Sequence, residues 1–480
     1  MVGTLLLGAP SPIRASIADP TNVYISFDTP ADTGRCASPD YTADGIDNHD
    51  VIMDAVTATN AGGTLHFCPG TYDINATIDL GGKLITLSGA SAVTTILDGG
   101  GATQILRSSG AITVAALTFH DGYTVDYGGA IYSDSTAIVT DSTFTNNDSA
   151  DYGGAIYSPT ATVTDSTFTN NTATNGGGAI YALTATVSTS TFTNNTAGYV
   201  GGAIRARIAT ISTSTFTDNT AGYGGANNVV TYGGAILANT ATVTSSTFTN
   251  NTASRGGAIS TLATATVISS TFTNNTANRG GAIYSNHHVI VTSSNFMNND
   301  ATTFGGAIFT SAAATVTAST FRNNSADYSG GAINTYSAIV TTSIFTSNVA
   351  ARGGAILVST NATVTRSTFT SNSAITDGGA ILANTGTIAR SRFTRNTAGG
   401  HGGAVHLWAP NSGNLRKMRG ITFTRNRAGV GGAITLGSCG PAVSRSQAAR
   451  VEGANRFSGN RATVKRRTNN IESETGYCGD

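Results

Sequence analysis

A pattern of about 24 residues recurs along most of this chain of 480 residues and limits what it can fold into. The string Gly-Gly-Ala-Ile/Val occurs thirteen times, at spacings of 23 to 25 residues except for 32 before Gly233 and 29 before Gly431. A second string, Phe-x-x-Asn, also occurs thirteen times and usually follows the glycine pair by about 15 residues. Repeats of this length indicate a solenoid, in which each unit covers the apolar side of its neighbour.

Each period reads as a set of short strands. Apolar and polar residues alternate in 161–164 and again around Phe168, and Ile156 begins another short run after its glycine pair. We find no amphipathic helical stretch inside the repeats. Three short strands per period form one coil of a parallel β-helix, with coils about 4.8 Å apart. The predicted fold class is therefore an all-β, single-stranded parallel β-helix.

Stacked coils place equivalent residues on top of one another. The phenylalanines are predicted to form an interior column, and the asparagines a ladder of side-chain amides along the axis. The glycine pair is expected where the backbone needs a positive φ or approaches another strand too closely for a Cβ. The predicted ladder residues of the first coils are Phe144, Phe168, Phe192, Asn147, Asn171 and Asn195.

The whole sequence divides into four predicted segments. Residues 1–18 resemble a secretory signal, although a basic start is missing, and residues 19–84 are predicted to cap the N-terminal end. Residues 85–462 are the predicted β-helix, and residues 463–480 are a basic C-terminal tail. A cap is needed because the open end of a coil exposes unpaired strand edges.

Two cysteines lie near each end of the chain. Pairing Cys36 with Cys68 and Cys439 with Cys478 would staple both termini, while two other pairings are equally allowed by the sequence. Disulfides indicate an oxidising compartment, hence a secreted or cell-surface protein. No Cys-x-x-Cys spacing is present, which disfavours a structural zinc site.

The distribution of charged and apolar residues along the chain indicates which classes of partner to expect. Residues 1–384 hold 11 Lys/Arg and 22 Asp/Glu, and residues 385–480 hold 15 Lys/Arg and 4 Asp/Glu. The basic end is interpreted as the solvated face of an end cap rather than a nucleic-acid site. No run of 18 apolar residues exists, so no transmembrane helix and at most peripheral membrane contact are expected. The protein is expected to be a monomer.

The two paired motifs resemble the repeat of the chlamydial polymorphic outer-membrane proteins, from Gly128 to Asn460. That resemblance implies a right-handed β-helix of the pectate-lyase-like (pectin-lyase) class. It also implies a secreted or surface-displayed adhesin, associated with a bacterial outer membrane. Residues 47–100 are similar to the capping helix and first coils of pectate-lyase-like proteins.

Catalytic candidates are few. Asp141 and Asp165 hold the same place in adjacent coils, about 5 Å apart, a separation that suits a retaining glycosidase. Thr and Ser occupy that place in the following coils, so two solvated turn acids are favoured and a non-enzymatic protein is the preferred interpretation. No cofactor is predicted, apart from calcium if the chain were a polysaccharide lyase.

The histidines give no predicted metal site. His287 and His288 are adjacent, so in a strand they point to opposite faces and make a poor chelator. His401 and His406 lie near a glycine turn.

The predicted binding surface is aromatic. Tyr132, Tyr157 and Tyr181 each follow an inward Ile, so they point outward as a strip that suits a glycan or a cell-surface protein. The alternative is a column of good strand formers that only shields the sheet. The predicted function is an adhesin-like protein binding such ligands. The alternative is a lyase, glycosidase or carbohydrate-binding module on the same fold.

A third function class comes from threonine. Thr-Phe-Thr recurs in eight coils, and its two threonines face outward in paired columns, as in ice-binding β-helices. Thr is also a good strand residue, and the columns are interrupted at Arg322 and Arg392.

Overall fold

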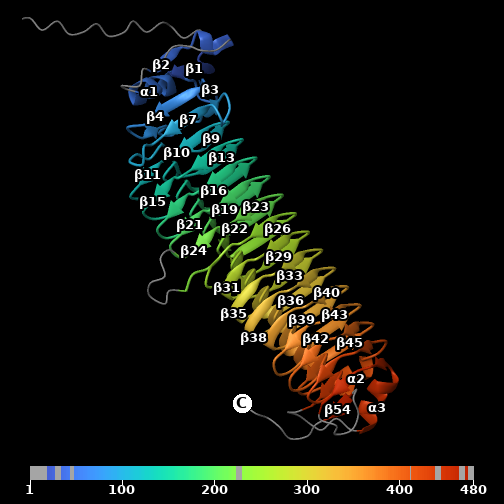
Figure 1. Cartoon of the computed structure of the whole chain (residues 1–480). Coiled ribbons are helices and arrows are strands. Elements are labelled where there is room, and N and C mark those ends of the chain that lie inside the picture. The colour runs from blue at the N-terminus through green and yellow to red at the C-terminus, as the bar shows by residue number, and fades with distance from the viewer. Residues whose placement is uncertain are drawn as a thin grey trace, which may run out of the picture.

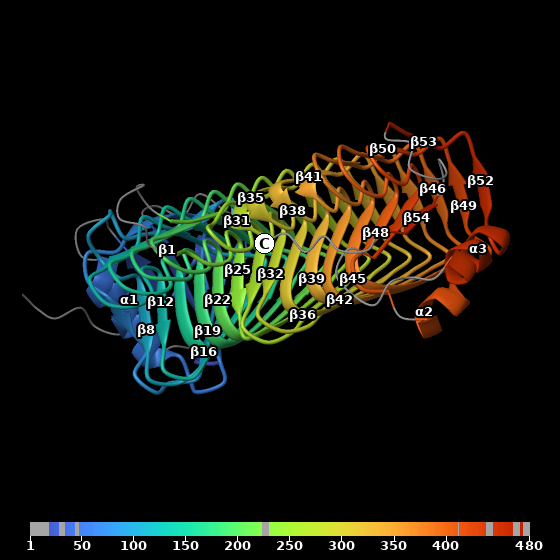
Figure 2. The same ribbon diagram turned by 90° about the horizontal axis from the view of Figure 1, so that it is seen from below.

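The computed structural model describes residues 19–27, 34–43, 48–222, 230–410, 412–437, 445–463 and 471–473. They form one elongated right-handed parallel β-helix, seen from the side in Figure 1 and from below in Figure 2. The predicted fold class is confirmed. Residues 1–18 and most of the predicted tail lie outside the described residues, so the four-segment division stays a prediction.

The N-terminal end is closed by a helix and a disulfide. Helix α1 (Asn48–Ala58) lies at the blue end of the rod, next to the first strands. Strand β1 (Asn22–Phe27) pairs in parallel with β2 (Tyr41–Ala43) and with β3 (Thr64–Phe67). The predicted Cys36–Cys68 disulfide is confirmed, with a Cα–Cα distance of 5.7 Å. Cys439 and Cys478 lie outside the described residues.

A typical coil has three strands. One coil consists of β16 (Ile156–Thr164), β17 (Thr167–Thr169) and β18 (Thr172–Ala173), and the next of β19 (Ile180–Ser188), β20 (Thr191–Thr193) and β21 (Thr196–Ala197). Their register puts each residue on its equivalent one period later, as Phe168 on Phe192. The first strands of the coils build a 25-stranded sheet and the second strands a 16-stranded sheet. On the third face, the strands up to β24 (Thr220–Ala221) form a 5-stranded sheet, and those from β31 (Thr276–Arg279) onward form an 8-stranded sheet.

Phenylalanine fills the interior. The rings from Phe119 to Phe457 stack one per coil, with ring centroids 4.7–5.1 Å apart and nearly parallel planes. Phe144, Phe168 and Phe192 are fully buried members of this column. The strand spacing, rather than an intrinsic ring preference, imposes face-to-face stacking here.

The asparagine of Phe-x-x-Asn forms a second interior ladder. In Asn171 the side-chain amide donates to the carbonyl oxygen of Phe144 at 3.0 Å and to Oδ1 of Asn195 at 2.9 Å. Its Oδ1 accepts from the backbone N–H and the side-chain amide of Asn147. Every polar atom of the buried amide is therefore satisfied, which a buried network requires. The ladder continues from Asn147 through Asn195 to Asn460.

Two turn positions explain the other fixed letters of the repeat. The residue before the ladder asparagine, such as Asn170, takes φ near +56°, a conformation that asparagine tolerates. In each glycine pair the first residue has a positive φ, as at Gly153 with +69°. The second glycine lies against the next coil, and a Cβ on Gly154 would be 2.1 Å from the carbonyl oxygen of Gly178. The first glycine of each pair thus supplies the predicted positive φ, and the second allows the predicted close approach of another strand.

Short helices and one strand lie at the C-terminal end. Helix α2 (Ser412–Lys417) follows Trp408, within the longer repeat of 29 residues before Gly431. Helix α3 (Arg445–Gly453) lies beside it at the red end of the rod. Strand β54 (Ile471–Ser473), inside the predicted tail, pairs with β51 (Ile434–Leu436). None of the helices in the described ranges has the length and hydropathy needed to cross a bilayer.

Candidate functional site

One corner of the rod gathers most of the surface aromatic residues. At several coils the glycine turn brings the residue before the glycine pair against the residue that follows the buried Ile in the same or the next coil. We name this surface the aromatic corner. Its members are Tyr127, Tyr132, Tyr152, Tyr157, Tyr181, Tyr232, Arg255, Arg279, Tyr284, Phe304, Phe309, Tyr328 and Arg352.

The structure brings the three predicted tyrosines side by side. The ring centroids of Tyr132 and Tyr157 are 5.4 Å apart, and those of Tyr157 and Tyr181 are 5.2 Å apart, with planes within 5°. All three side chains are half-buried. Since the rings cover one another's faces, they present their edges and hydroxyl groups to a ligand. Their role in binding stays a prediction.

A neighbouring carboxylate and partial burial raise the pKa of the tyrosine hydroxyls in this strip. The hydroxyl of Tyr132 donates to Oδ1 of Asp134 at 2.5 Å. This hydrogen bond, with partial burial, raises the pKa of Tyr132 to about 12. Burial raises the pKa of Tyr157. Both phenols are therefore protonated donors at neutral pH.

Further along, the same column is covered rather than outward-facing. Leu237, Ser260 and Tyr284 continue the register of Tyr181 but are buried. At Tyr284 the cause is Arg255, whose guanidinium lies 5.2 Å from the ring centroid. The simple alternation of faces fails here because the residue before a glycine pair folds over the column.

The corner widens into a groove in the C-terminal half. The groove has a volume of about 420 Å³ and a mostly apolar lining. Its aromatic lining residues are Phe304, Phe309, Tyr328, Tyr336 and Trp408. Tyr328 and Tyr336 are more than half exposed, so aromatic surface is open to solvent here.

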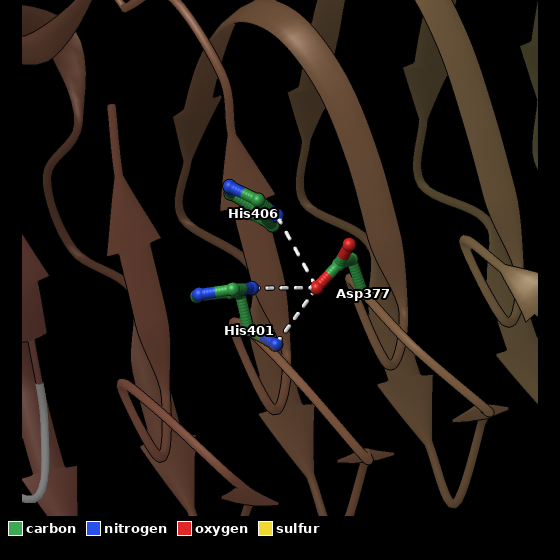
Figure 3. A group of neighbouring side chains, drawn as sticks. All are labelled: Asp377, His401 and His406. Atoms are coloured by element: carbon green, nitrogen blue, oxygen red, sulfur yellow. Dashed lines mark hydrogen bonds and ion pairs between the residues drawn. The ribbon is translucent and has the colours of Figure 1, made fainter. Parts of the chain in front are cut away.

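Three ligand-type side chains, drawn in Figure 3, lie near this groove, because the ring of His406 is next to that of the groove residue Trp408, with centroids 6.3 Å apart. Asp377 and His401 each precede a glycine pair in adjacent coils, so they stack, and His406 follows Val405 of β48 (Val405–Leu407). Oδ1 of Asp377 accepts the backbone N–H of His401 at 2.8 Å and lies 2.8 Å from Nδ1 of its ring. Nδ1 of His406 is 3.9 Å from the same oxygen.

The buried histidine dominates the electrostatics of this group. His406 is 2% exposed, and neither of its ring nitrogens has a hydrogen-bond partner among the described residues. Burial lowers the pKa of His406 to about 4 despite the opposing charge of Asp377. Burial works against ionisation of Asp377, but the hydrogen bond from His401 and the proximity of His406 outweigh it and lower its pKa. At neutral pH, Asp377 is therefore an ionised carboxylate and His406 is a neutral imidazole.

The other predicted chemical residues stay apart from the groove lining. Asp141 and Asp165 are exposed turn residues with φ of 48°. His287 and His288 are exposed. A second group, Asp98, His120 and Asp121, lies near the N-terminal end.

Asp377 is not among the residues predicted from the sequence, and the proximity of His401 and His406 is not predicted either. A signal was present, because Asp377 and His401 both directly precede Gly-Gly-Ala and are 24 residues apart. The alternation of strand faces does not identify this position as one that faces the corner.

Comparison with known proteins supports the repeat assignment. The Chlamydia polymorphic membrane protein repeat matches seven segments, namely residues 141–159, 165–183, 189–207, 245–262, 269–286, 318–336 and 366–384. The predicted resemblance is thereby confirmed, and these repeats suggest association with a cell surface or outer membrane. No curated protein sequence matches the chain.

One solved structure is similar at a low level. It is the catalytic unit of a thermostable GH87 alpha-1,3-glucanase from Streptomyces thermodiastaticus, with 13% identity and a TM-score of 0.32. The match covers 86% of this chain and 66% of the glucanase chain, so it spans slightly less than two thirds of that protein. A likeness at this level carries no argument about activity.

Proposed function

We propose that this chain is a surface-displayed, adhesin-like β-helix that binds a cell-surface protein through the aromatic corner and carries out no reaction. The observation that carries the proposal is the run of Tyr, Phe and Arg side chains along one edge of the rod. Tyr and Arg, with Trp, are the residue types enriched at the energetic centres of protein interfaces.

The ring geometry favours a protein over a glycan ligand. A sugar normally packs on the face of an aromatic ring, but the faces of Tyr157 are covered by Tyr132 and Tyr181. One face of Tyr132 is also covered by the guanidinium of Arg107, 5.1 Å from the ring centroid. Ring edges and hydroxyl groups remain, and these suit hydrogen bonds and side-chain packing with a protein surface.

Replacing Tyr157 with alanine is expected to weaken binding to target cells by about tenfold or more, the effect of removing an interface hot spot. Binding of the purified, labelled chain to cultured cells, with and without protease treatment of the cell surface, measures this. The matched control is Tyr123→Ala, a half-buried tyrosine in β11 (Tyr123–Thr124) on another face. Equal binding by Tyr157→Ala and the unmodified chain would contradict the proposal.

The same purified chain also distinguishes the proposed protein-binding function from a glycan-binding or an enzymatic one. Binding that survives protease but is lost after glycosidase treatment of the cells would point to a glycan ligand instead. Turnover on pectin, alginate or glucan panels, with or without calcium, would point to an enzyme. In that case Asp141→Asn or Asp165→Asn should abolish the turnover.

A second candidate, an ice-binding surface, is favoured by one specific observation. Both threonines of Thr-Phe-Thr stay in register through six successive coils, from β14 (Thr143–Thr145) to β30 (Thr271–Thr273). They form two parallel columns on the 16-stranded sheet, with a repeat of about 4.8 Å. Thermal hysteresis of the purified chain tests it, and replacing Thr215 and Thr217 with lysine should remove the effect.

A further inference from the structure

We propose that Asp377, His401 and His406 form a binding site for one divalent transition-metal ion, with Zn²⁺ as the probe. The inference is independent of the adhesin function, because it rests on the side chains shown in Figure 3 alone. Two imidazoles and one carboxylate are a ligand set that suits zinc and other first-row metals, whereas calcium prefers oxygen ligands alone.

The distances fit such a site after small adjustments. Each of the three residues offers one ligand atom, and these atoms lie within 4.8 Å of one another. In a tetrahedral zinc site with bonds of about 2.0–2.1 Å, the ligand atoms are roughly 3.3 Å apart. Asp377 Oδ1 lies 2.8 Å from Nδ1 of His401 and 3.9 Å from Nδ1 of His406. The observed distances therefore bracket the value that a bound ion would impose.

The second, independent observation is the state of His406. Its side chain is almost fully buried, its Nδ1 faces the carboxylate of Asp377, and neither ring nitrogen has a hydrogen-bond partner in the described chain. An unsatisfied buried polar atom destabilises the folded chain, so such atoms call for an explanation. A metal ion bound to Nδ1 would use the lone pair that has no partner.

The backbone holds the site in place without any ion. Asp377 and His401 occupy equivalent turn positions in adjacent coils, and their chains are joined by the hydrogen bond from the backbone N–H of Gly378 to the carbonyl oxygen of His401 at 2.8 Å. His406 is in register with Leu382 on the 25-stranded sheet. His406 is therefore carried by a paired strand, where a ligand keeps its geometry better than on a loop, and the inter-coil hydrogen bond restrains the two turn ligands.

Three protein ligands leave a coordination position open, as in zinc sites that bind an exogenous group. The groove adjoins this cluster, because Trp408 lines the groove and its ring lies edge-on to His406 with centroids 6.3 Å apart. The class of group that would fill the position is water or a carboxylate.

The second group of ligand-type residues serves as an internal comparison. Asp98, His120 and Asp121 also come within 4.8 Å of one another, but all three are partly exposed, so this group has no buried member. Nδ1 of His120 is already 3.2 Å from Oδ2 of Asp98. No buried, unpartnered nitrogen points into this group, so it carries no proposal.

The test is Zn²⁺ binding to the purified full-length chain without a histidine tag, by calorimetry and by metal analysis after dialysis. We expect one ion per chain. Asp377→Asn, His401→Gln and His406→Gln should each lower the affinity by at least about tenfold, because even outer-shell changes at metal sites have effects of this size. Co²⁺ bound in place of Zn²⁺ should give the intense visible absorption of a tetrahedral site, and His401→Gln should abolish it.

The matched control is the double variant His287→Ala/His288→Ala, which removes two exposed histidines and should bind Zn²⁺ normally. His120→Ala should do the same. His406 is buried, so its variant could fail to fold, but His401 and Asp377 are partly exposed and their variants keep the test decisive. Absence of Zn²⁺ binding, or binding unchanged by His401→Gln and Asp377→Asn, would overturn the proposal.

Discussion

Replacing Asn275 with leucine is expected to lower the free energy of unfolding by about 3–5 kcal/mol, because several buried polar atoms lose their partners together. Oδ1 of Asn275 accepts from the backbone N–H and the side-chain amide of Asn251. Its own amide donates to the carbonyl oxygen of Phe248 and to Oδ1 of Asn299. Leucine has the same branching and the same number of side-chain heavy atoms, but it satisfies none of these four groups. Urea unfolding followed by circular dichroism measures the change.

The adjacent asparagine provides the control. Asn274 has φ of +55°, a conformation that glycine adopts without strain. Asn274→Gly is therefore expected to change the unfolding free energy by no more than about 1 kcal/mol. If the two variants were equally stable, the amide ladder would not be a main source of stability.

The second large effect is expected from Gly257→Ala, with a loss of more than about 4 kcal/mol, in the range reserved for severe structural conflicts. A Cβ on Gly257 would lie 2.2 Å from the carbonyl oxygen of Gly281 and 2.6 Å from that of Thr276. Both atoms belong to the backbone of the next coil, so relief requires the coils to separate. Limited proteolysis and urea unfolding should both show a destabilised chain.

Gly82→Ala is the matched control for that variant. The nearest atom to a Cβ on Gly82 is Oγ of Ser109 at 3.7 Å, an ordinary contact distance. Its stability should stay within about 1 kcal/mol of the unmodified chain. A stable Gly257→Ala variant would mean that the coils are not in the close contact described here.

The repeat made the fold predictable because strand spacing forces equivalent residues to stack. The columns that contain Phe144 and Asn147 follow from that rule, since each coil repeats the same residues. A related column, in which Oγ of Ser166 accepts the backbone N–H of Ser142, was missed. These serines lie in the turns between two strands, and a serine there carries no sequence signal that distinguishes an inward hydroxyl from a solvated one.

The candidate site was harder to predict for a physical reason. Alternation places side chains on one face or the other of a strand, but it does not describe a corner. At the corner, the residue before a glycine pair folds against the next strand, as Arg255 does on Tyr284. Asp377, His401 and His406 meet through that turn, so their proximity depends on backbone geometry beyond simple periodicity.

The central claim is that the coils stack in register, one strand spacing per repeat, and distances between spin labels test it most directly. Labels at Thr167 paired with labels at Thr215, Thr247, Thr320 or Thr422 lie two, three, six and ten coils apart in the 16-stranded sheet. Pulsed electron resonance should give distances that rise by about 4.8 Å per coil. The 32-residue step from Thr215 to Thr247 should count as a single coil. Distances that follow residue number instead, or that show no regular increment, would contradict the account.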